Sequence, residues 1–392
     1  MRIGIDCLRI DPSYVGGVNT FTLGLLDGFA AVGNGHRFNL YVTESNQKLF
    51  ARFKNTPRFK LVSTNTHTLR ARKMLCRAAL LSRSSQLFRV TSNLAYENIQ
   101  AKMDADCDIL YTPTVVLHSF RSRRPTVLSM HDIQHLHYPE FFSWEKRLSR
   151  TITYGLSAEY AHCLQASSEF IKKDVLAHMS PKRVEIISEG VIVEDFAERR
   201  DIERLRERYG LPDRFLFCPA QLWLHKDHLT ILKALKEIEK REGLKVPLIM
   251  TGASFSAAPS ILKFISEQDM SYARYLGKVP FEDIVALYQA CDFLISASVY
   301  ESSSLPILEA AAAGTPIIAS KIPSHEELGR RLQLNLFGPG CVDELANVLL
   351  SSWDDKATAF AQAAHNRDNV GFYSWNNVAR KYLNLFEEIV SA

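Results

Sequence analysis

The sequence predicts an α/β protein with two domains, each built on a parallel β-sheet covered by helices. The chain has 392 residues and is 46% hydrophobic, enough for two cores of ordinary size. Short apolar runs alternate with helix-length segments along the whole chain, as in βαβ units. No uninterrupted apolar run reaches the roughly eighteen residues expected of a membrane span.

The apolar runs form two series, one in each half of the chain. In the first half they lie at residues 3–7, 38–42, 109–111, 126–130 and 184–187. In the second half they lie at residues 215–218, 247–250, 275–276, 293–296 and 316–319. A charged stretch at 194–208 separates the two series, and we interpret it as a link with a solvated helix. The predicted domains are therefore 1–192 and 193–371, followed by a final helix at 372–392.

Cysteine usage and the N-terminus indicate the compartment. The seven cysteines are dispersed, with no Cys-x-x-Cys pair, which argues against a disulfide framework or a zinc ribbon. The chain starts with a predicted strand and lacks a signal-peptide core. We expect a cytoplasmic protein.

The clearest functional pattern lies between Val299 and Ser320. Glu301 and Glu309 flank a serine-rich turn that leads into an alanine-rich helix, which is predicted to end at Gly314. The start of a helix offers free N–H groups and a positive dipole end, which suit a diphosphate. Carboxylates accept hydrogen bonds from vicinal hydroxyls, such as those of a sugar and a ribose. The alternative is that Glu301 is a surface charge and Glu309 an ordinary acid near a helix start.

This segment resembles the signature of the family 4 retaining glycosyltransferases, which have the GT-B fold. The shared residues are Glu301, Leu305, Pro306, Glu309, Ala310, Gly314 and Pro316. The departure is Ser302, Ser303 and Ser304, where the family mostly has glycine, an aromatic or apolar residue, and glycine. The resemblance covers nearly the whole chain. It implies two Rossmann-like domains facing a central cleft, with the acceptor bound by the N-terminal domain and the donor by the C-terminal domain.

The resemblance also implies roles for these residues. Glu301 would hold the donor sugar and Glu309 the ribose, while Ser302, Ser303, Ser304 and Leu305 would lie at the diphosphate. The helix predicted at 372–392 would cross back to the N-terminal domain.

A second segment, residues 217–228, follows a predicted strand and precedes an amphipathic helix. Lys226 can neutralise a leaving diphosphate as a compact cation. The segment is similar to the family's Gly-Arg-Leu-x-x-x-Lys loop, with Ala220 and Gln221 in place of glycine and arginine. We assign Gln221 and His225 to the donor site. Either His225 partly replaces the arginine, or the site holds the diphosphate with one fewer positive charge. The alternative, an exposed lysine at a helix start, places a cation where the dipole disfavours it.

Two positions in the first half extend the resemblance. Gly16 and Gly17 follow the first predicted strand, and paired glycines allow close approach to a ligand. The resemblance places them in the donor site, near the phosphates and the acceptor. His131 ends the strand at 126–130 and begins the family's His-Asp motif, whose histidine borders the reacting sugar. The alternative for His131 is a buried structural imidazole.

No metal site is predicted. His135 and His137 follow His131 but do not form a helical histidine pair with a further ligand. The resemblance implies metal-independent chemistry without a cofactor. It also places Gly252 and Val279 in loops that approach the nucleotide base.

The distribution of charged residues indicates a basic surface that contacts a partner. Between Glu44 and Glu97 there is no acidic residue, whereas eleven lysines and arginines lie between positions 48 and 89. Interleaved apolar residues, including Leu69, Met74, Leu75, Leu81, Leu87 and Phe88, predict a cationic amphipathic segment that lies on an anionic membrane. The alternative is a solvated pair of basic helices. Nucleic acid is not expected, because no recognition module accompanies the patch.

We therefore predict a retaining hexosyltransferase that uses a nucleotide-sugar donor and a saccharide or lipid-linked saccharide acceptor. Its loops are most similar to bacterial surface-polysaccharide mannosyltransferases, as in O-antigen or lipopolysaccharide synthesis, which favours GDP-mannose as the donor. A nucleotide-sugar epimerase or a phosphorylase of the same fold remains an alternative. An inactive donor-binding subunit with a partner surface is a further one.

Overall fold

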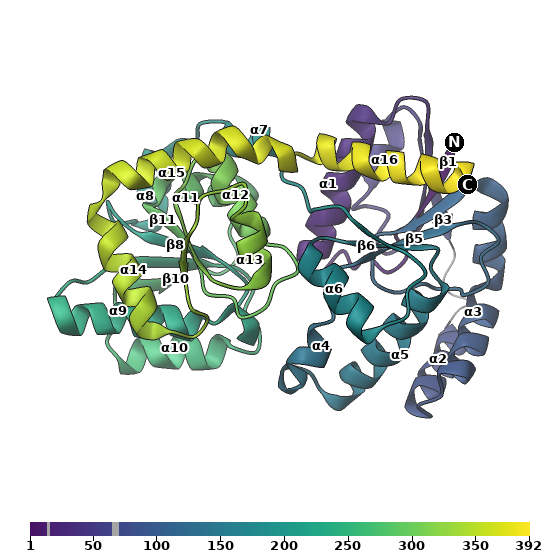
Figure 1. Cartoon of the computed structure of the whole chain (residues 1–392), viewed down its shortest axis with the longest axis horizontal. Helices are drawn as coiled ribbons and strands as arrows, with labels where there is room; N and C mark the ends of the chain where they lie inside the picture. The colour runs from purple at the N-terminus through teal and green to yellow at the C-terminus, as the bar shows by residue number, and fades with distance from the viewer. Residues whose placement is uncertain (14–15, 65–69) are drawn as a thin grey trace. The chain divides into compact units, whose positions relative to one another are not determined.

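Every strand pairing among the described residues is parallel, and the strands form two separate sheets. The computed structural model describes residues 1–13, 16–64 and 70–392, apart from the side chains of 70–73. The chain divides into unit 1, Met1–Gly190 with Trp375–Ala392, and unit 2, Val191–Ser374 (Figure 1). The predicted fold class of two parallel Rossmann-like sheets is confirmed.

Unit 1 contains a seven-stranded sheet in the order β3-β2-β1-β4-β5-β6-β7 within the described residues. Its strands are β1 (Arg2–Asp6), β2 (Arg37–Thr43), β3 (Phe59–Thr64), β4 (Ile109–Thr112), β5 (Thr126–Met130), β6 (Cys163–Ala166) and β7 (Val184–Ile186). Its helices are α1 (Gly17–Val32), α2 (Arg70–Leu81), α3 (Ser85–Asp106), α4 (Gln134–His137), α5 (Trp144–Tyr160), α6 (Glu169–His178) and α16 (Trp375–Ser391). Short 3₁₀ turns are η1 (Ala51–Asn55) and η3 (Pro139–Phe141).

Unit 2 contains a six-stranded sheet in the order β10-β9-β8-β11-β12-β13. Its strands are β8 (Leu216–Pro219), β9 (Leu248–Thr251), β10 (Ala273–Tyr275), β11 (Phe293–Ser296), β12 (Ile317–Ser320) and β13 (Asn335–Phe337). Its helices are α7 (Val193–Ala197), α8 (Ile202–Tyr209), α9 (His228–Glu242), α10 (Ala258–Glu267), α11 (Phe281–Ala290), α12 (Leu305–Ala313), α13 (Pro323–Leu328), α14 (Val342–Asp354) and α15 (Lys356–Asn369). The 3₁₀ turns are η4 (Leu224–Lys226) and η5 (Val370–Tyr373).

The core of unit 2 shows why its strands are continuously apolar. Along β8, Phe217 belongs to one buried cluster, whereas its neighbours Leu216 and Cys218 belong to another. Successive side chains of a strand point to opposite faces, so both faces of this sheet are buried under helices. This packing fixes the strand ends from which the functional loops emerge.

Helix α16 packs along α1 in unit 1 (Figure 1). Gly24 and Gly28 of α1 make this close approach possible. A Cβ at Gly24 would lie 2.2 Å from Trp375 Nε1, and one at Gly28 would lie 2.5 Å from the Trp375 carbonyl oxygen. Trp375 is 5% exposed and packs edge-to-face on Phe21 at 5.5 Å. The C-terminal helix is therefore an integral part of unit 1.

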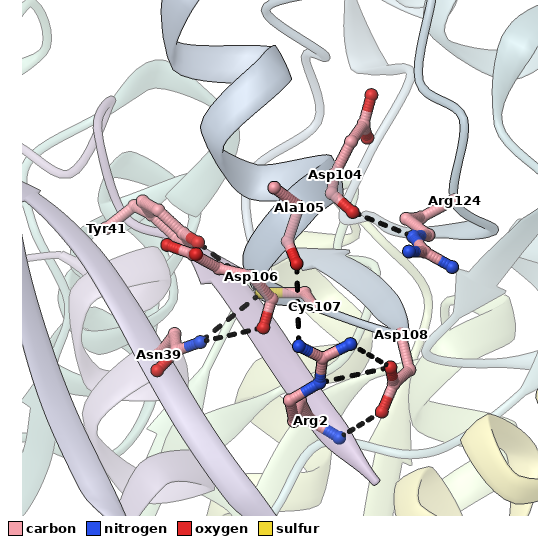
Figure 2. Close-up of polar contacts among 9 residues, drawn as sticks. All are labelled: Arg2, Asn39, Tyr41, Asp104, Ala105, Asp106, Cys107, Asp108 and Arg124. Atoms are coloured by element: carbon pink, nitrogen blue, oxygen red, sulfur yellow. Dashed lines mark hydrogen bonds and ion pairs between the residues drawn. The ribbon is translucent and has the colours of Figure 1, made fainter.

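A polar cluster connects the amino ends of β1 and β4 to the last turn of α3 (Figure 2). Arg2 Nη2 donates to Asp108 Oδ1 at 2.7 Å, and the Arg2 backbone N–H donates to Asp108 Oδ2 at 2.7 Å. Arg124 Nε donates to the Asp104 carbonyl oxygen at 2.8 Å. The last carbonyls of a helix lack intrahelical donors, and here an arginine supplies one.

Two expectations about charged segments need correction. Residues 194–208 belong to unit 2 and are not a link, because Phe196 of α7 and Leu205 of α8 are buried in its core cluster. The other residues of α8 are exposed or partly exposed, as expected for a solvated helix. The basic stretch 48–89 is not one amphipathic segment, because η1, β3, α2 and the start of α3 divide it. Phe88 faces the interior at 3% exposure. Leu69 lies outside the described residues.

Candidate functional site

The strand order of unit 2 places β8 beside β11, although helices and two strands separate them in the sequence. The order reverses at this pair, and ligands of open α/β sheets bind outside the carboxyl ends of the strands at such a point. Lys226 follows β8 and Glu301 follows β11. The two residues therefore come from adjacent loops at the edge of the sheet where a ligand is expected.

Lys226 and Glu301 form a largely buried ion pair. Lys226 Nζ donates to Glu301 Oε1, and Ser298 Oγ donates to the same oxygen at 2.7 Å. The side chains of Lys226 and Glu301 are only 18% and 13% exposed. The Val299 N–H donates to the His225 carbonyl oxygen at 2.8 Å, which joins the two loops through their backbones.

The charges around Glu301 keep it ionised. Burial disfavours the carboxylate, but the charge of Lys226, a contribution from His225 and the hydrogen bonds from Lys226 and Ser298 together outweigh burial and hold the pKa of Glu301 below its usual range. An ionised carboxylate only accepts hydrogen bonds, so Glu301 can bind hydroxyl or ammonium donors.

The backbone at the start of α12 has N–H groups available for an anion. Ser304 is the N-cap with φ −132°, but its side chain makes no capping hydrogen bond. Among the residues that the structure describes, the N–H groups of Ser303, Ser304 and Leu305 have no hydrogen-bond acceptor. Free N–H groups at a positive helix end suit phosphate oxygens. Ser302 and Ser303 are partly exposed, and Ser304 is 2% exposed. At its other end α12 stops at Gly314, which has the left-handed conformation, as predicted.

Glu309 lies one turn into α12, and its neighbour is a residue that sequence reasoning missed. Tyr288 of α11 donates its hydroxyl to Glu309 Oε2 at 2.7 Å and is fully buried. Burial raises the pKa of Glu309, and the Tyr288 hydrogen bond opposes that rise. In the sequence Tyr288 is one aromatic residue of an amphipathic helix, with nothing to mark it as a carboxylate partner.

His325 is a second residue without a sequence signal. Its Nδ1 donates to the Ser320 carbonyl oxygen at 2.8 Å. Burial lowers the pKa of His325 to about 4, so the ring is neutral at physiological pH. Ser320 Oγ donates to the Ser298 carbonyl oxygen at 2.5 Å, and Ser298 in turn binds Glu301. These bonds support the loop that carries Glu301.

The loops after β8 and β9 are tightly joined. Gly252 has φ +132°, and a Cβ there would lie 2.7 Å from the Ala220 carbonyl oxygen, so only glycine fits. Gln221 Oε1 accepts a hydrogen bond from Trp223 Nε1 at 3.0 Å, and the Trp223 ring stacks on Phe255 at 3.9 Å. Val279 packs against a core cluster of unit 2. The sequence did not indicate the aromatic stack.

In unit 1, His131 follows β5 at the carboxyl edge of the sheet. Its Nε2 donates to the Pro113 carbonyl oxygen at 2.7 Å, and its Nδ1 lies 3.9 Å from Glu189 Oε1. The ring packs edge-to-face on Phe21 at 4.9 Å. Burial lowers the pKa of His131, so the imidazole is neutral. With the proton on Nε2, the lone pair of Nδ1 can accept a hydrogen bond.

Gly16 and Gly17 begin α1, after the strand at which the unit 1 sheet reverses order. Gly16 is the N-cap, with an extended φ of −159° that any residue adopts. A Cβ at Gly17 would meet nothing within 4 Å. Neither glycine is required by the local backbone, so their predicted role depends on access for a ligand.

The chain has two Rossmann-like units with parallel sheets. In unit 2 a lysine, a glutamate and a helix start with available N–H groups lie at one switch point. These features are those of the GT-B class of glycosyltransferases. The sequence comparisons agree with this class. The profile of Glycosyltransferase Family 4 matches residues 15–195, and that of Glycosyl transferases group 1 matches residues 213–355. The chain therefore carries a family 4 glycosyltransferase domain and a group 1 glycosyltransferase domain, in agreement with the family 4 signature in its sequence.

The curated relatives include mannosyltransferases at low identity. The serotype-specific mannosyltransferase WbdA of Escherichia coli is 24% identical over 247 residues, which cover 60% of this chain and 30% of WbdA. The O-antigen chain mannosyltransferase B of Escherichia coli is 23% identical over 266 residues, which cover 67% of this chain and 70% of that protein. The chain thus spans less than a third of WbdA.

Solved structures share the fold along the whole chain. Anabaena Alr3699/HepE, crystallised with UDP and glucose, matches with a TM-score of 0.76 at 18% identity and covers 99% of this chain and 100% of its own. WaaG, a glycosyltransferase involved in lipopolysaccharide biosynthesis, matches with a TM-score of 0.68 at 15% identity and covers 98% and 99%. At these identities the likeness shows the GT-B fold.

Proposed function

We propose that this protein transfers a hexose from a nucleotide-diphosphate sugar to a saccharide or lipid-linked saccharide, with retention of anomeric configuration. The observation that carries the proposal is the edge of unit 2, where Lys226 and Glu301 pair beside the free start of α12. A cation and free N–H donors suit a leaving diphosphate, and an ionised carboxylate suits sugar hydroxyls.

The residues then have distinct roles in the proposed donor complex. Lys226 and the N–H groups of Ser303, Ser304 and Leu305 bind the diphosphate and stabilise its charge as it leaves. Oε1 of Glu309, which has no hydrogen-bond donor within the described part of the chain, accepts a ribose hydroxyl, while Tyr288 donates to Oε2. Gln221, His225, Gly252 and Val279 complete the proposed donor set.

When the donor binds, Lys226 and Glu301 must form hydrogen bonds with it as well as with each other. In the free chain each satisfies the other. In the complex, Lys226 donates a hydrogen bond to a phosphate oxygen, and Glu301 accepts one from a sugar hydroxyl. The ammonium has three donors and the carboxylate several acceptor positions, so the pair need not break.

For the reaction we propose a same-face displacement. The acceptor oxygen bonds to the anomeric carbon as the bond from that carbon to the phosphate oxygen breaks, and a phosphate oxygen takes the acceptor proton. The proposed role of His131 is to accept a sugar hydroxyl at Nδ1, and Gly16 and Gly17 leave room for the ligand. We propose that protein cations and the helix dipole act without a metal or cofactor.

GDP-mannose is the proposed donor, because WbdA and the O-antigen chain mannosyltransferase B are named as mannosyltransferases. HepE is described with UDP and glucose, so a uridine nucleotide is the principal competitor. The proposed acceptor class is supported by the name of the O-antigen chain mannosyltransferase B and by WaaG, which is described as involved in lipopolysaccharide biosynthesis.

We further propose that the protein works in the cytoplasm with α2 and α3 on an anionic membrane surface. Large apolar side chains are exposed there: Met74, Leu75, Leu81, Leu87, Val90 and Leu94, at 43% to 73%. Basic residues of the same helices supply attraction to anionic lipid. Among the described helices, none has the length and hydropathy of a membrane span.

Calorimetric titration tests the donor site. The protein is titrated with GDP-mannose, UDP-glucose, UDP-GlcNAc and dTDP-rhamnose, alongside Glu309→Ala and the control Glu282→Ala, an exposed glutamate of α11 in the same unit. We expect one nucleotide sugar to bind, with affinity lost in Glu309→Ala and unchanged in Glu282→Ala. Failure of every donor to bind refutes the donor site. Isomerised donor formed without acceptor would identify an epimerase instead.

A further inference from the structure

Away from the donor site, three potential metal ligands of unit 1 lie close together. His137 Nε2 is 2.8 Å from both carboxylate oxygens of Asp174, and His178 Nδ1 is 3.2 Å from Asp174 Oδ1. One ligand atom from each residue lies within 4.8 Å of the other two. The Asp174 side chain is 6% exposed, whereas His137 and His178 are 33% and 41% exposed.

Two separate elements bring these side chains together. Asp174 and His178 are four residues apart on α6 and therefore share a face of that helix. His137 is the last residue of α4, a short helix that follows the His131-Asp132 motif. The Gln134 N–H donates to Asp132 Oδ1 at 3.0 Å at the start of α4, and Tyr138 stacks on Phe141 at 5.1 Å just after it. The segment that presents His137 is thus held at both ends.

We propose that His137, Asp174 and His178 bind a divalent transition-metal ion, with zinc as the best match. Two imidazoles and one carboxylate are typical zinc ligands, with bonds of about 2.0–2.2 Å. Tetrahedral geometry at such bond lengths separates ligand atoms by roughly 3.3 Å, close to the observed 2.8 and 3.2 Å. The exposed histidine edges leave a fourth position open to water.

The protonation of the cluster is compatible with a metal ion. In the structure the Asp174 carboxylate accepts a hydrogen bond from His137 Nε2, so that proton lies where the ion would bind. His178 Nδ1 also lies 2.9 Å from the Asp174 carbonyl oxygen, to which it donates when it carries the proton. Metal binding therefore requires the neutral His178 ring to carry its proton on Nε2, which a neutral imidazole can do.

A simple helical pair does not account for the arrangement. Asp174 and His178 alone would form an ordinary contact between residues four apart, as is common on helices. The third side chain comes from another segment and meets the same nearly buried carboxylate. A bound cation requires ligand atoms that converge on one point, and here one ligand atom from each of the three residues lies within 4.8 Å of the other two.

The ion would cross-link α4 to α6. This joins the segment directly after His131 to a helix whose start is capped by Ser168 Oγ, which accepts the Ile171 N–H at 3.3 Å. The site lies within unit 1 and does not depend on the proposed sugar transfer. Its expected effect is thermal stabilisation of unit 1 in the absence of any nucleotide sugar, since a ligand that binds only the folded state stabilises it.

The test is calorimetric titration of chelator-treated full-length protein with ZnCl₂, with thermal unfolding followed in parallel. The variants are His137→Ala and His178→Ala, whose exposed side chains allow folding, and the control is His162→Ala, an exposed histidine of the same unit. We expect one zinc site in the wild type and in His162→Ala. Each cluster variant should bind at least ~100-fold more weakly, because loss of a partner of a ligand alone costs 10–100-fold.

The outcomes separate a metal site from a hydrogen-bonded cluster. Zinc should raise the unfolding temperature of the wild type and of His162→Ala, and should leave both cluster variants unshifted. Equal zinc affinity in the wild type and His178→Ala would place any bound zinc elsewhere, for example at a cysteine, and overturn the proposal. No zinc binding by the wild type would show that the three residues only hydrogen-bond to one another.

Discussion

Replacing Lys226 by alanine should destabilise unit 2, because it leaves Glu301 as a buried carboxylate without its ammonium partner. Removing one partner of a fully buried ion pair costs about 3–5 kcal/mol. Here the side chains are 18% and 13% exposed, and Ser298 Oγ still donates to Glu301, so about 2 kcal/mol is expected. For a unit of 150–250 residues, this corresponds to a fall of about 4–8 °C in unfolding temperature.

The assay is thermal unfolding of the wild type, Lys226→Ala, Glu301→Gln and the double variant, with the exposed Lys233→Ala of α9 as the control. The double variant should lose less stability than the sum of the single losses, by about 1–2 kcal/mol. The pKa of folded Glu301 is lowered, so the stabilisation is present above the unfolded pKa and is lost as the pH falls through the folded one. Strictly additive losses at pH 7 would refute the pairing.

Three further predictions concern helix packing, stability in acid and Glu309, the carboxylate proposed to bind the ribose. Gly24→Ala should destabilise unit 1 by about 1–3 kcal/mol in thermal unfolding, because its Cβ meets the Trp375 ring, whereas Gly17→Ala should be nearly neutral. Burial lowers the pKa of His228 and His325 to about 4. Each buried ring therefore lowers the free energy of unfolding as the pH falls from about 6.5 to 4, by up to ~1.4 kcal/mol per pH unit. If the free energy of unfolding of His325→Asn kept the pH dependence of the wild type, this would contradict the prediction for His325. Tyr288→Phe should weaken nucleotide-sugar binding by roughly 3- to 10-fold in calorimetry, since Glu309 loses a hydrogen bond that favours its ionised form. The comparison variant is Tyr275→Phe, which removes a hydroxyl that donates to the Gly252 carbonyl oxygen. It should separate the effect on Glu309 from a general loop effect.

Much of the fold could be predicted because buried parallel strands are short, continuous apolar runs. Each predicted strand overlaps an observed one, but β3, β6 and β13 were not predicted. Strand β6 contains Gln165, which is 2% exposed and donates to the Ile187 carbonyl oxygen at 2.6 Å. A buried polar residue satisfied by a distant carbonyl looks like a loop residue in the sequence. Strand β3 lies at the sheet edge within the basic stretch, where charge hides its pattern.

The residues of the proposed donor site were recognisable where they form a local pattern, and were missed where they depend on tertiary contacts. The signature around Glu301 and Glu309 is contiguous, so it could be found. The pairing of Glu301 with Lys226 depends on β8 lying beside β11, which spacing does not reveal. His137 was considered with His131 and His135, its sequence neighbours. Its spatial partners Asp174 and His178 come from a helix that follows another strand.

Unit 2 is inserted into unit 1 through two adjacent connections. The chain leaves unit 1 after Gly190 and returns at Trp375, and the two ends of the insert are held side by side, since the Val191 N–H donates to the Tyr373 carbonyl oxygen at 2.9 Å. An insert with joined ends can be cut out or replaced without stretching its host, as in natural domain insertions. The donor-binding residues proposed here, from Gln221 to Glu309, all lie on this one insert, so we expect that an exchange of the insert between relatives would need only two junctions.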